Sequence, residues 1–371
     1  MNAKVSKQKI RPDSNPYRNS SFLKVLDNRL NKNLPLQIAF LDIDRTLIGN
    51  GDSQLSFKTR KILAEQGYIF AAVTSRTEEM TISEEEYHLS KKKYIFPRPP
   101  PKPSAEAAGI LDADIIAASS GTKLLIHQIG GGYLEDIEYR QRFGASPQIW
   151  RTAVISLINK INSSHKLAKF FLPENKNHYF QGKTDIFSPP LDFRINLFFT
   201  SIEDKLHFTR EFERMKTIKN TLDLRLTDDS DPDKKIYSIY ITPRLGYKRT
   251  AIEWVIDKTC LALNVKRKDL KLLIAGDSWP DLEMGLFSGN AIKNITFVIV
   301  GGSRLAPYLT EKERRQFAGE DLFSIKRFLK TDKEKGVYKF MMPGYERKVI
   351  IGDLAFPGKK GPETLLCYFQ T

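Results

Sequence analysis

Four short stretches of this sequence carry side chains that could do chemistry, and carboxylates dominate two of them. Asp42 and Asp44 stand two residues apart at the end of an apolar run that begins at Leu36, and Asp277 and Asp281 follow another apolar run. Like charges held this close repel each other. A bound divalent cation relieves the repulsion, and hard oxygen ligands together with a phosphate suit Mg²⁺. The spacing therefore predicts a magnesium site.

The other two stretches supply groups that bind anions. Thr74 and Ser75 follow a third apolar run, where a hydroxyl and backbone amides could hold phosphate oxygens. Lys248 lies near the predicted start of a helix, where its charge would balance the carboxylates and a phosphate. Each stretch alone has an ordinary explanation, as a turn, a helix cap or a solvated surface. Their order, and the apolar run before three of the four, favour one shared functional site.

The elements that must position these residues are strands of a parallel sheet. The run 36–44 is almost continuously apolar, which is typical of a parallel strand buried on both faces. Residues 59–66 are expected to form a helix that ends at Gly67, and residues 68–74 a second buried strand. Strand, helix and strand make a right-handed parallel unit, and such sheets bind ligands beyond the carboxyl ends of their strands. We therefore predict an α/β fold with a Rossmann-like parallel-sheet core.

Together, these stretches resemble the motifs of the haloacid dehalogenase-like hydrolase superfamily. The resemblance covers roughly residues 36–302, and its four motifs match, in order, Asp42, Asp44 and Thr46; Thr74; Lys248; and Gly276, Asp277 and Asp281. The inserted module lies between the second and third motifs, as in the type-II-capped branch, which includes sugar-phosphate phosphatases. The chain departs from the family pattern at Arg45, Ser75, Trp279 and Pro280.

The resemblance implies a role for each motif residue. Asp42 is the nucleophile that forms an aspartyl-phosphate, and Asp44 is the general acid and base. Magnesium is held by Asp42, the backbone carbonyl of Asp44, and Asp277, with Asp281 supporting that shell. Phosphate is bound by Thr74, Ser75 and Lys248. The cap chooses the leaving group, with Arg194 and Lys183 as candidate selectors, although Arg194 could equally face solvent on a cap strand.

The texture of the sequence changes several times and predicts a division into domains. A proline-rich stretch at 97–103 is expected to be a stiff connector. Helical periodicity at 149–161 and alternation at 192–200 indicate a separate α+β module. We predict a polar, basic N-terminal tail at 1–34 with one short helix near 22–30, core at 35–129, an inserted cap at 130–235, core again at 236–302, and a C-terminal extension at 303–371 packed on the core.

The composition of the chain limits which binding partners and which cellular compartment we expect. The net charge of +15 attracts anions but does not choose among phosphorylated metabolites, nucleic acid and membranes. We expect a small phosphorylated substrate rather than nucleic acid, because an inserted cap restricts a site to small ligands. No apolar run is long enough to cross a bilayer, so no membrane is expected. The two cysteines, Cys260 and Cys367, suit a reducing compartment, which indicates a cytoplasmic protein.

Three functions remain open on the sequence. The first is a phosphatase, a phosphoric monoester hydrolase, for a small metabolite such as a sugar phosphate. The second is a phosphatase for a phosphoprotein or a nucleic-acid end, which the basic charge would favour. The third is a non-catalytic binding or regulatory protein that kept the fold. The presence of Asp42, Asp44, Thr74, Lys248 and Asp277 together argues against the third.

Overall fold

The computed structural model describes most of the chain. The described residues are 15–48, 53–76, 81–83, 85–86, 88–89, 112–144, 146–165, 193–199, 201–219, 223–228, 230, 237–305, 329–332, 334–342 and 345–371. The proline-rich stretch at 97–103 and Lys183 lie outside them.

A large mixed sheet forms the centre of the molecule. Its strand order is β11-β12-β13-β10-β9-β1-β2-β3-β4-β5. The six central strands run parallel, and antiparallel hairpins flank them on both sides. The predicted α/β class is confirmed. The parallel strands are β13 (Tyr345–Ile351), β10 (Asn294–Ile299), β9 (Leu270–Gly276), β1 (Leu36–Leu41), β2 (Tyr68–Val73) and β3 (Ile115–Ala118); the antiparallel ones are β4 (Lys123–His127), β5 (Tyr133–Glu135), β11 (Leu329–Thr331) and β12 (Val337–Met342).

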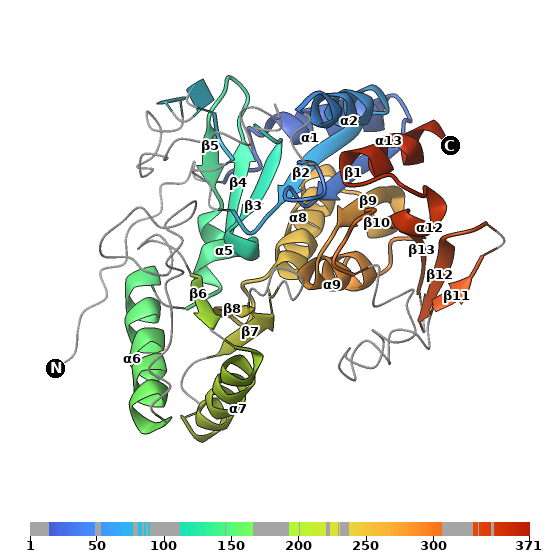
Figure 1. The fold of residues 1–371 in the computed structure, drawn as a ribbon. Coiled ribbons are helices and arrows are strands. Elements are labelled where there is room, and N and C mark those ends of the chain that lie inside the picture. Colours follow the sequence, from blue (N-terminus) through green and yellow to red (C-terminus); the bar gives the residue numbers. More distant parts are fainter. Residues whose placement is uncertain are drawn as a thin grey trace.

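Helices cover both faces of this sheet, as Figure 1 shows. Every residue of β1 is buried, and its side chains alternate between two separate apolar clusters. Ile38 and Phe40 pack on the face covered by α1 (Ser21–Asn31), α8 (Lys248–Leu263) and α9 (Trp279–Phe287). Ala39 and Leu41 pack on the face covered by α2 (Ser53–Glu65) and α13 (Pro362–Gln370). This double burial is why the strand reads as continuously apolar.

A second, smaller unit has its own core. Its antiparallel sheet has the order β6-β8-β7, from Ile195–Phe199, Tyr237–Pro243 and Leu224–Asp228. Two long helices, α6 (Pro147–His165) and α7 (Ile202–Lys219), complete it, and Figure 1 places this unit below the large sheet. Apolar side chains from both helices and from the sheet form one cluster, which includes Trp150, Phe208 and Ile241. This is the α+β module that the sequence indicated, and we call it the cap.

In the structure, the cap begins and ends at other residues than the predicted range 130–235. Strand β5 pairs with β4 in the large sheet, and α5 (Ile137–Gln141) packs Tyr139 into the core beside it. Strand β8, expected to open the second part of the core, is instead the central strand of the cap sheet. An apolar strand does not reveal which sheet it joins, because the partner strands are far away in sequence.

Both terminal regions contribute to the core. The predicted helix near 22–30 is α1, and its buried Phe22 and Leu26 pack against the large sheet rather than lying in a polar tail. The C-terminal region adds β11, β12 and β13 to one side of the sheet, followed by α12 (Gly352–Ala355) and α13, which packs on α2. These late elements are part of the fold of the core itself.

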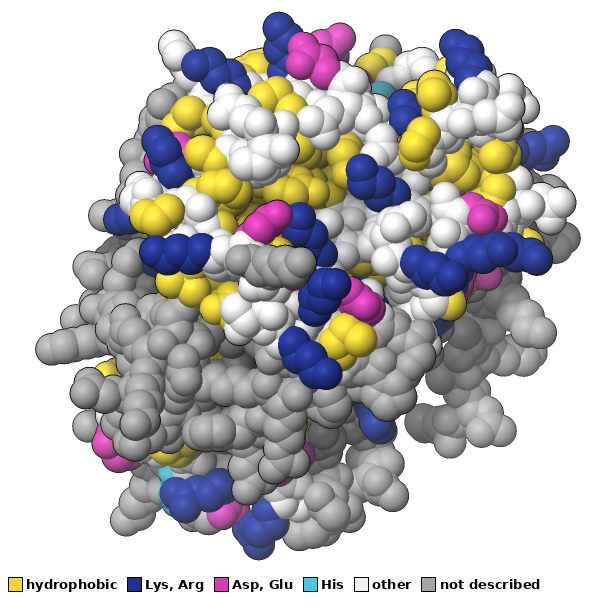
Figure 2. Space-filling model, turned by 90° about the vertical axis from the view of Figure 1, so that its right-hand side faces the viewer, with side chains coloured by type: hydrophobic (Ala, Val, Ile, Leu, Met, Phe, Trp, Pro, Cys, Tyr) yellow, Lys and Arg dark blue, Asp and Glu magenta, His cyan; other side chains and the backbone are white. Residues whose placement is uncertain are grey.

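On the face drawn in Figure 2, Lys and Arg side chains lie among hydrophobic and acidic ones. Within the described residues, no helix is long and apolar enough to span a membrane.

Candidate active site

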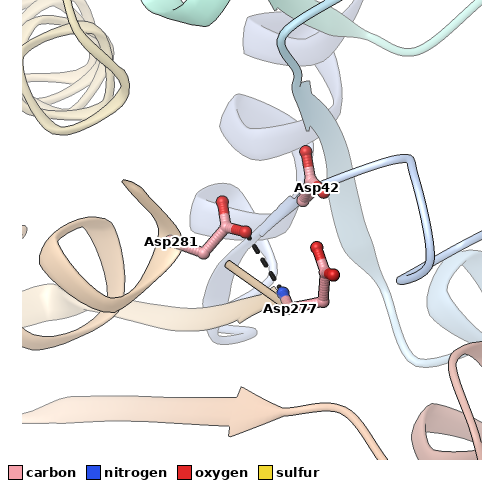
Figure 3. A group of neighbouring side chains, drawn as sticks. All are labelled: Asp42, Asp277 and Asp281. Atoms are coloured by element: carbon pink, nitrogen blue, oxygen red, sulfur yellow. Dashed lines mark hydrogen bonds between the residues drawn. The ribbon is translucent and has the colours of Figure 1, made fainter. Parts of the chain in front are cut away.

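Three carboxylates meet where the central strands end. Asp42 follows β1 directly and Asp277 follows β9, and the backbone N–H of Asp42 donates to the carbonyl of Ala275 at 3.0 Å. Asp281 lies in the first turn of α9. All three side chains are buried, and each offers an oxygen within 4.8 Å of the others (Figure 3). Neighbouring parallel strands bring the residues after them to one edge of the sheet, which is why two distant motifs meet.

Lys248 ties two of these carboxylates together. Its Nζ donates to Oδ1 of Asp42 at 2.8 Å and to Oδ1 of Asp281 at 2.6 Å, and its side chain is only 4% exposed. Lys248 is the first residue of α8, whose N-terminus lies against the turn after β3. Gly121 permits this approach, because a Cβ there would stand 2.7 Å from the backbone nitrogen of Lys248. Gly121 also has a φ of +90°, which suits glycine.

Asp281 is fully engaged by the protein. Its Oδ2 accepts from the backbone N–H groups of Asp277 and Ser278 at 3.1 and 3.0 Å and from the Ser278 hydroxyl at 2.6 Å. This is a capping box at the start of α9. Gly276 makes room for it, since a Cβ there would lie 2.4 Å from the Asp281 carboxyl carbon. Asp281 therefore shapes the loop that carries Asp277 and orients Lys248.

Burial and charge act against each other on the Asp42–Lys248 pair. Burial raises the pKa of Asp42 well above its usual range, while Lys248 opposes that shift. Burial alone would lower the pKa of Lys248, but the carboxylates of Asp281 and Asp42 outweigh it and raise that pKa. The lysine is therefore charged at neutral pH and stabilises the ionised form of Asp42, which a nucleophile needs.

Asp277 is the least satisfied carboxylate of the group. Its Oδ2 is buried and, among the described residues, accepts no hydrogen bond. Two arginines approach that oxygen: Nε of Arg304 at 3.5 Å and Nη1 of Arg45 at 4.0 Å. Arg45 has a φ of 61°, a left-handed conformation that costs a non-glycine residue about 1–2 kcal/mol. Burial raises the pKa of Asp277 to about 7, although Arg304 lowers it.

The raised pKa of Asp277 predicts a pH-dependent stability in the absence of metal. Between the ordinary value of 3.8 and about 7, the unfolded chain is ionised at this position while the folded chain holds the proton. The folded state binds more protons, so the free energy of unfolding falls as pH rises through this window, by roughly 4 kcal/mol at most. Denaturant unfolding of metal-free protein from pH 4 to 8 measures this slope.

The control for that experiment is Asp277→Asn, which is neutral throughout. It should remove this part of the pH slope, and an unchanged slope would contradict the assignment. Because a metal binds the deprotonated carboxylate, Mg²⁺ should also stabilise the wild-type protein more at pH 8 than at pH 6.

Asp44 lies apart from the three clustered carboxylates. Its two oxygens accept hydrogen bonds from the guanidinium of buried Arg76, with Nη2 to Oδ1 at 2.6 Å and Nε to Oδ2 at 3.0 Å. Its side chain remains 40% exposed. A fork of this kind fixes the direction of a carboxylate. Arg76 thus orients the Asp44 carboxylate while the side chain stays partly accessible to solvent.

Thr74 and Ser75 lie in the loop after β2, directly before Arg76, which binds Asp44. The hydroxyl of Thr74 is buried and accepts from the backbone N–H of Arg76 at 3.0 Å. The turn after β3 fixes this loop, because the backbone N–H of Ser120 donates to the carbonyl of Thr74 at 2.9 Å. Ser75 is half-buried, and its carbonyl accepts a hydrogen bond from Arg194 of the cap. The second predicted motif therefore stands between the core and the cap.

Arg194 is buried rather than facing solvent, with 8% exposed. Besides Ser75, its guanidinium contacts Oδ1 of Asn196 at 2.6 Å and lies 5.0 Å from the ring centre of Tyr240. Arg151 donates to its carbonyl at 2.9 Å. Arg194 thus joins the cap to the loop that carries Thr74.

A second arginine joins the cap to the core. Arg225 on β7 forms a two-pronged ion pair with Glu283 on α9, one prong being Nη1 to Oε1 at 3.3 Å. The guanidinium also lies 4.1 Å from the ring centre of Tyr247, the residue before Lys248. The cap therefore contacts the two helices that carry Asp281 and Lys248.

The Arg225–Glu283 pair should show a measurable coupling energy. A double-mutant cycle with Arg225→Met and Glu283→Gln, read by the free energy of unfolding, should give about 1 kcal/mol, because the pair is bidentate and less than one-third exposed. The control is Arg214–Glu211 within α7, whose arginine is 60% exposed and whose coupling should stay below about 0.5 kcal/mol. Equal coupling energies for the two pairs would contradict the view that the Arg225–Glu283 pair stabilises the contact between cap and core.

Comparisons with known proteins found similar solved structures at low sequence identity. No family model and no curated protein matches the chain. The chain is similar in structure to haloacid dehalogenase-like hydrolases. The sucrose-phosphatase of Synechocystis, solved with sucrose and phosphate, has 12% sequence identity and a TM-score of 0.49, over 91% of this chain and 99% of that chain. A haloacid dehalogenase-like hydrolase from Bacteroides thetaiotaomicron has 13% identity and a TM-score of 0.42, over 76% and 92%. One from Bacillus subtilis has 14% and 0.37, over 74% and 87%.

Sequence reasoning assigned no role to several charged residues at this site. Arg76 stands next to the motif residues Thr74 and Ser75, and Arg45 lies between Asp44 and Thr46, so adjacency could have pointed to both. Arg304 follows β10 and lies at the same edge of the sheet, which a strand-end search could have found. Arg225 gave no signal, since only the folding of the cap brings it to the core.

Proposed function

We propose that this protein is a magnesium-dependent phosphatase of the haloacid dehalogenase-like type. It hydrolyses a small phosphorylated metabolite, with a sugar phosphate as the favoured class, through an aspartyl-phosphate on Asp42. The observation that carries the proposal is the buried group of Asp42, Asp277 and Asp281 with the Nζ of Lys248 bonded to two of them. Holding three carboxylates together in a buried place is costly and serves no purpose in packing.

The residues present fit a magnesium ion. The buried Oδ2 of Asp277, without a hydrogen bond among the described residues, is the kind of oxygen that a hard cation satisfies. Asp42, Asp277 and the backbone carbonyl of Asp44 would hold the ion, with Asp281 supporting the loop. When bound, the ion offsets the negative charge on the phosphoryl group and on the carboxylates.

In the first step, Asp42 attacks phosphorus. Because Lys248 already holds Oδ1, we assign the attack to Oδ2. A bond forms between Oδ2 and phosphorus while the ester bond from phosphorus to the leaving oxygen breaks, and Asp44 gives that oxygen its proton. Lys248 and the hydroxyl of Thr74 stabilise the phosphoryl oxygens.

In the second step, water attacks the phosphorus of the aspartyl-phosphate. Asp44 takes a proton from that water, the bond from phosphorus to Asp42 breaks, and free phosphate leaves. The bidentate contact from Arg76 keeps the Asp44 carboxylate in one place for both transfers. The two steps together consume one water, and they regenerate the Asp42 carboxylate and the protonated Asp44.

The cap would select the leaving group. Of the two candidate selectors, only Arg194 lies within the described residues. Its guanidinium donates to the carbonyl of Ser75, the residue after Thr74. Lys183, the other candidate, lies outside the described residues. Cap closure over the site would exclude water and restrict access to small ligands.

The test is phosphate release from a panel of phosphorylated sugars, nucleotides, phosphopeptides and 5′-phosphorylated oligonucleotides, with Mg²⁺ and with a chelator. Magnesium-dependent release that favours one small-molecule class is the expected result. Preference for the peptides or oligonucleotides would replace the small-molecule proposal with the phosphoprotein or nucleic-acid alternative. Absence of release from every member would favour a non-catalytic binding or regulatory protein.

Asp44→Asn should separate the two steps. Without the acid and base, turnover is expected to fall by about 10²–10⁴-fold, while a substrate with a good leaving group still phosphorylates Asp42. Rapid quench with a labelled substrate should therefore trap covalent phosphate on the variant. Wild-type turnover by Asp44→Asn would refute the assigned role.

A further inference from the structure

Two arginines stand beside the carboxylate that would hold the metal. Arg45 comes from the loop after β1 and Arg304 from the loop after β10, and both approach Oδ2 of Asp277, at 4.0 and 3.5 Å. Their side chains are 37% and 23% exposed, so both keep part of their surface in contact with solvent. The backbone N–H of Arg304 also donates to the carbonyl of Asp277 at 2.9 Å, which holds the two loops together.

When its carboxylates are all ionised, the described part of the site carries no net charge before any metal binds. Among the described residues, the four carboxylates of Asp42, Asp44, Asp277 and Asp281 contact four cations, Lys248, Arg76, Arg45 and Arg304. A divalent cation added to this set leaves two positive charges in excess. A phosphate dianion removes that excess, so the balance is restored only when metal and phosphate are both bound.

Arg45 is held where it is despite its backbone. Its left-handed φ of 61° favours glycine, and a glycine there would relieve the strain. A strained residue that persists at a site is a reason to look for a role in that site. The guanidinium is the part of Arg45 that approaches Asp277, so we look for the function of Arg45 in its positive charge.

We infer that Arg45 and Arg304 couple magnesium binding to phosphate binding. In the metal-free protein they are the counter-ions of Asp277 whenever that carboxylate is ionised, and they oppose a divalent cation at that oxygen. Once the Asp277 carboxylate binds the metal, the two guanidiniums are available to bind the phosphate. Guanidinium groups bind phosphate oxygens well. Metal and phosphate therefore strengthen each other's binding, and by linkage the factor is the same in both directions.

This inference rests on the proposed function but is tested without turnover. Isothermal calorimetry would measure Mg²⁺ affinity with and without inorganic phosphate for the wild type, Arg45→Gly and Arg304→Gln. In the wild type, phosphate should tighten Mg²⁺ binding by about tenfold or more. In each variant, Mg²⁺ alone should bind about 5–10-fold more tightly, and the gain from phosphate should fall below about threefold.

The control is Arg214→Gln, which removes one positive charge from an exposed arginine on α7 and should keep the wild-type values. Circular dichroism of each variant verifies the fold, and Arg45→Gly should be no less stable than the wild type because it relieves strain. Wild-type coupling in both arginine variants, or weaker binding of Mg²⁺ alone by them, would overturn the inference. Coupling in a protein that releases no phosphate from any ester would uphold it while the proposed function fails.

Discussion

Replacing Asp42 with Asn is expected to reduce phosphate release by at least about 1,000-fold, because the amide cannot form the covalent intermediate. Asn has nearly the same shape, and its carbonyl can still accept the hydrogen bond that Lys248 makes to Oδ1 of Asp42. The variant should therefore keep its thermal unfolding midpoint within a few degrees. Phosphate release under saturating substrate and Mg²⁺ measures the effect, and mass spectrometry of quenched reactions should find no phosphorylated protein.

The matched control is Asp223→Asn, since the Asp223 side chain is 68% exposed and its one ion pair within the described residues is a long contact to Arg244 at 3.7 Å. That variant should retain wild-type turnover. Activity above a few per cent in a clean preparation of Asp42→Asn would remove Asp42 as nucleophile. Loss of activity in both variants would point to a general loss of native structure instead.

Lys248→Met is expected to be the most destabilising substitution at the site. It leaves two buried carboxylates, Asp42 and Asp281, without the cation that both now contact. Removing one partner from a buried ion pair typically lowers the free energy of unfolding by about 3–5 kcal/mol, because the remaining charge stays buried. Phosphate release should also be lost, since the transition state loses its fixed cation.

The destabilisation caused by Lys248→Met should depend on pH in one particular direction. Without Lys248, the pKa of Asp42, already raised by burial, rises further, so the folded variant takes up a proton more readily than the unfolded chain. The destabilisation relative to the wild type should then shrink as pH is lowered from 8 to 5. Denaturant unfolding across this range, with Lys268→Met on the exposed surface as control, measures it. A deficit independent of pH would mean that lost packing, rather than uncompensated charge, causes the destabilisation.

The sequence by itself determined the central strands and identified four residues that the fold brings together. Strand β1 is buried on both faces, so its apolar run could not be confused with an amphipathic element, and the residues after it had to lie at the edge of the sheet. The same argument placed Asp277 after β9. Asp42, Asp277, Asp281 and Lys248, named from their order along the chain, do meet in space.

Only the tertiary structure decided which strand joins which sheet. Strands β5 and β8 are short or apolar segments that fit either unit, and pairing with β4 or with β6 and β7 assigned them. The C-terminal strands could not be placed for the same reason. Strand pairing joins residues far apart in sequence, so local pattern carries little information about it.

The tertiary structure also decided which cation faces which carboxylate. Arg76 was visible beside Thr74, yet its bond to Asp44 depends on the turn after β3. Arg304 follows β10 and contacts Asp277, and Arg225 lies on β7 of the cap and contacts Glu283. Each contact forms only after the elements involved have packed together. Charge pairing acts over a few ångströms, and the sequence alone does not give distances of that kind between separate elements.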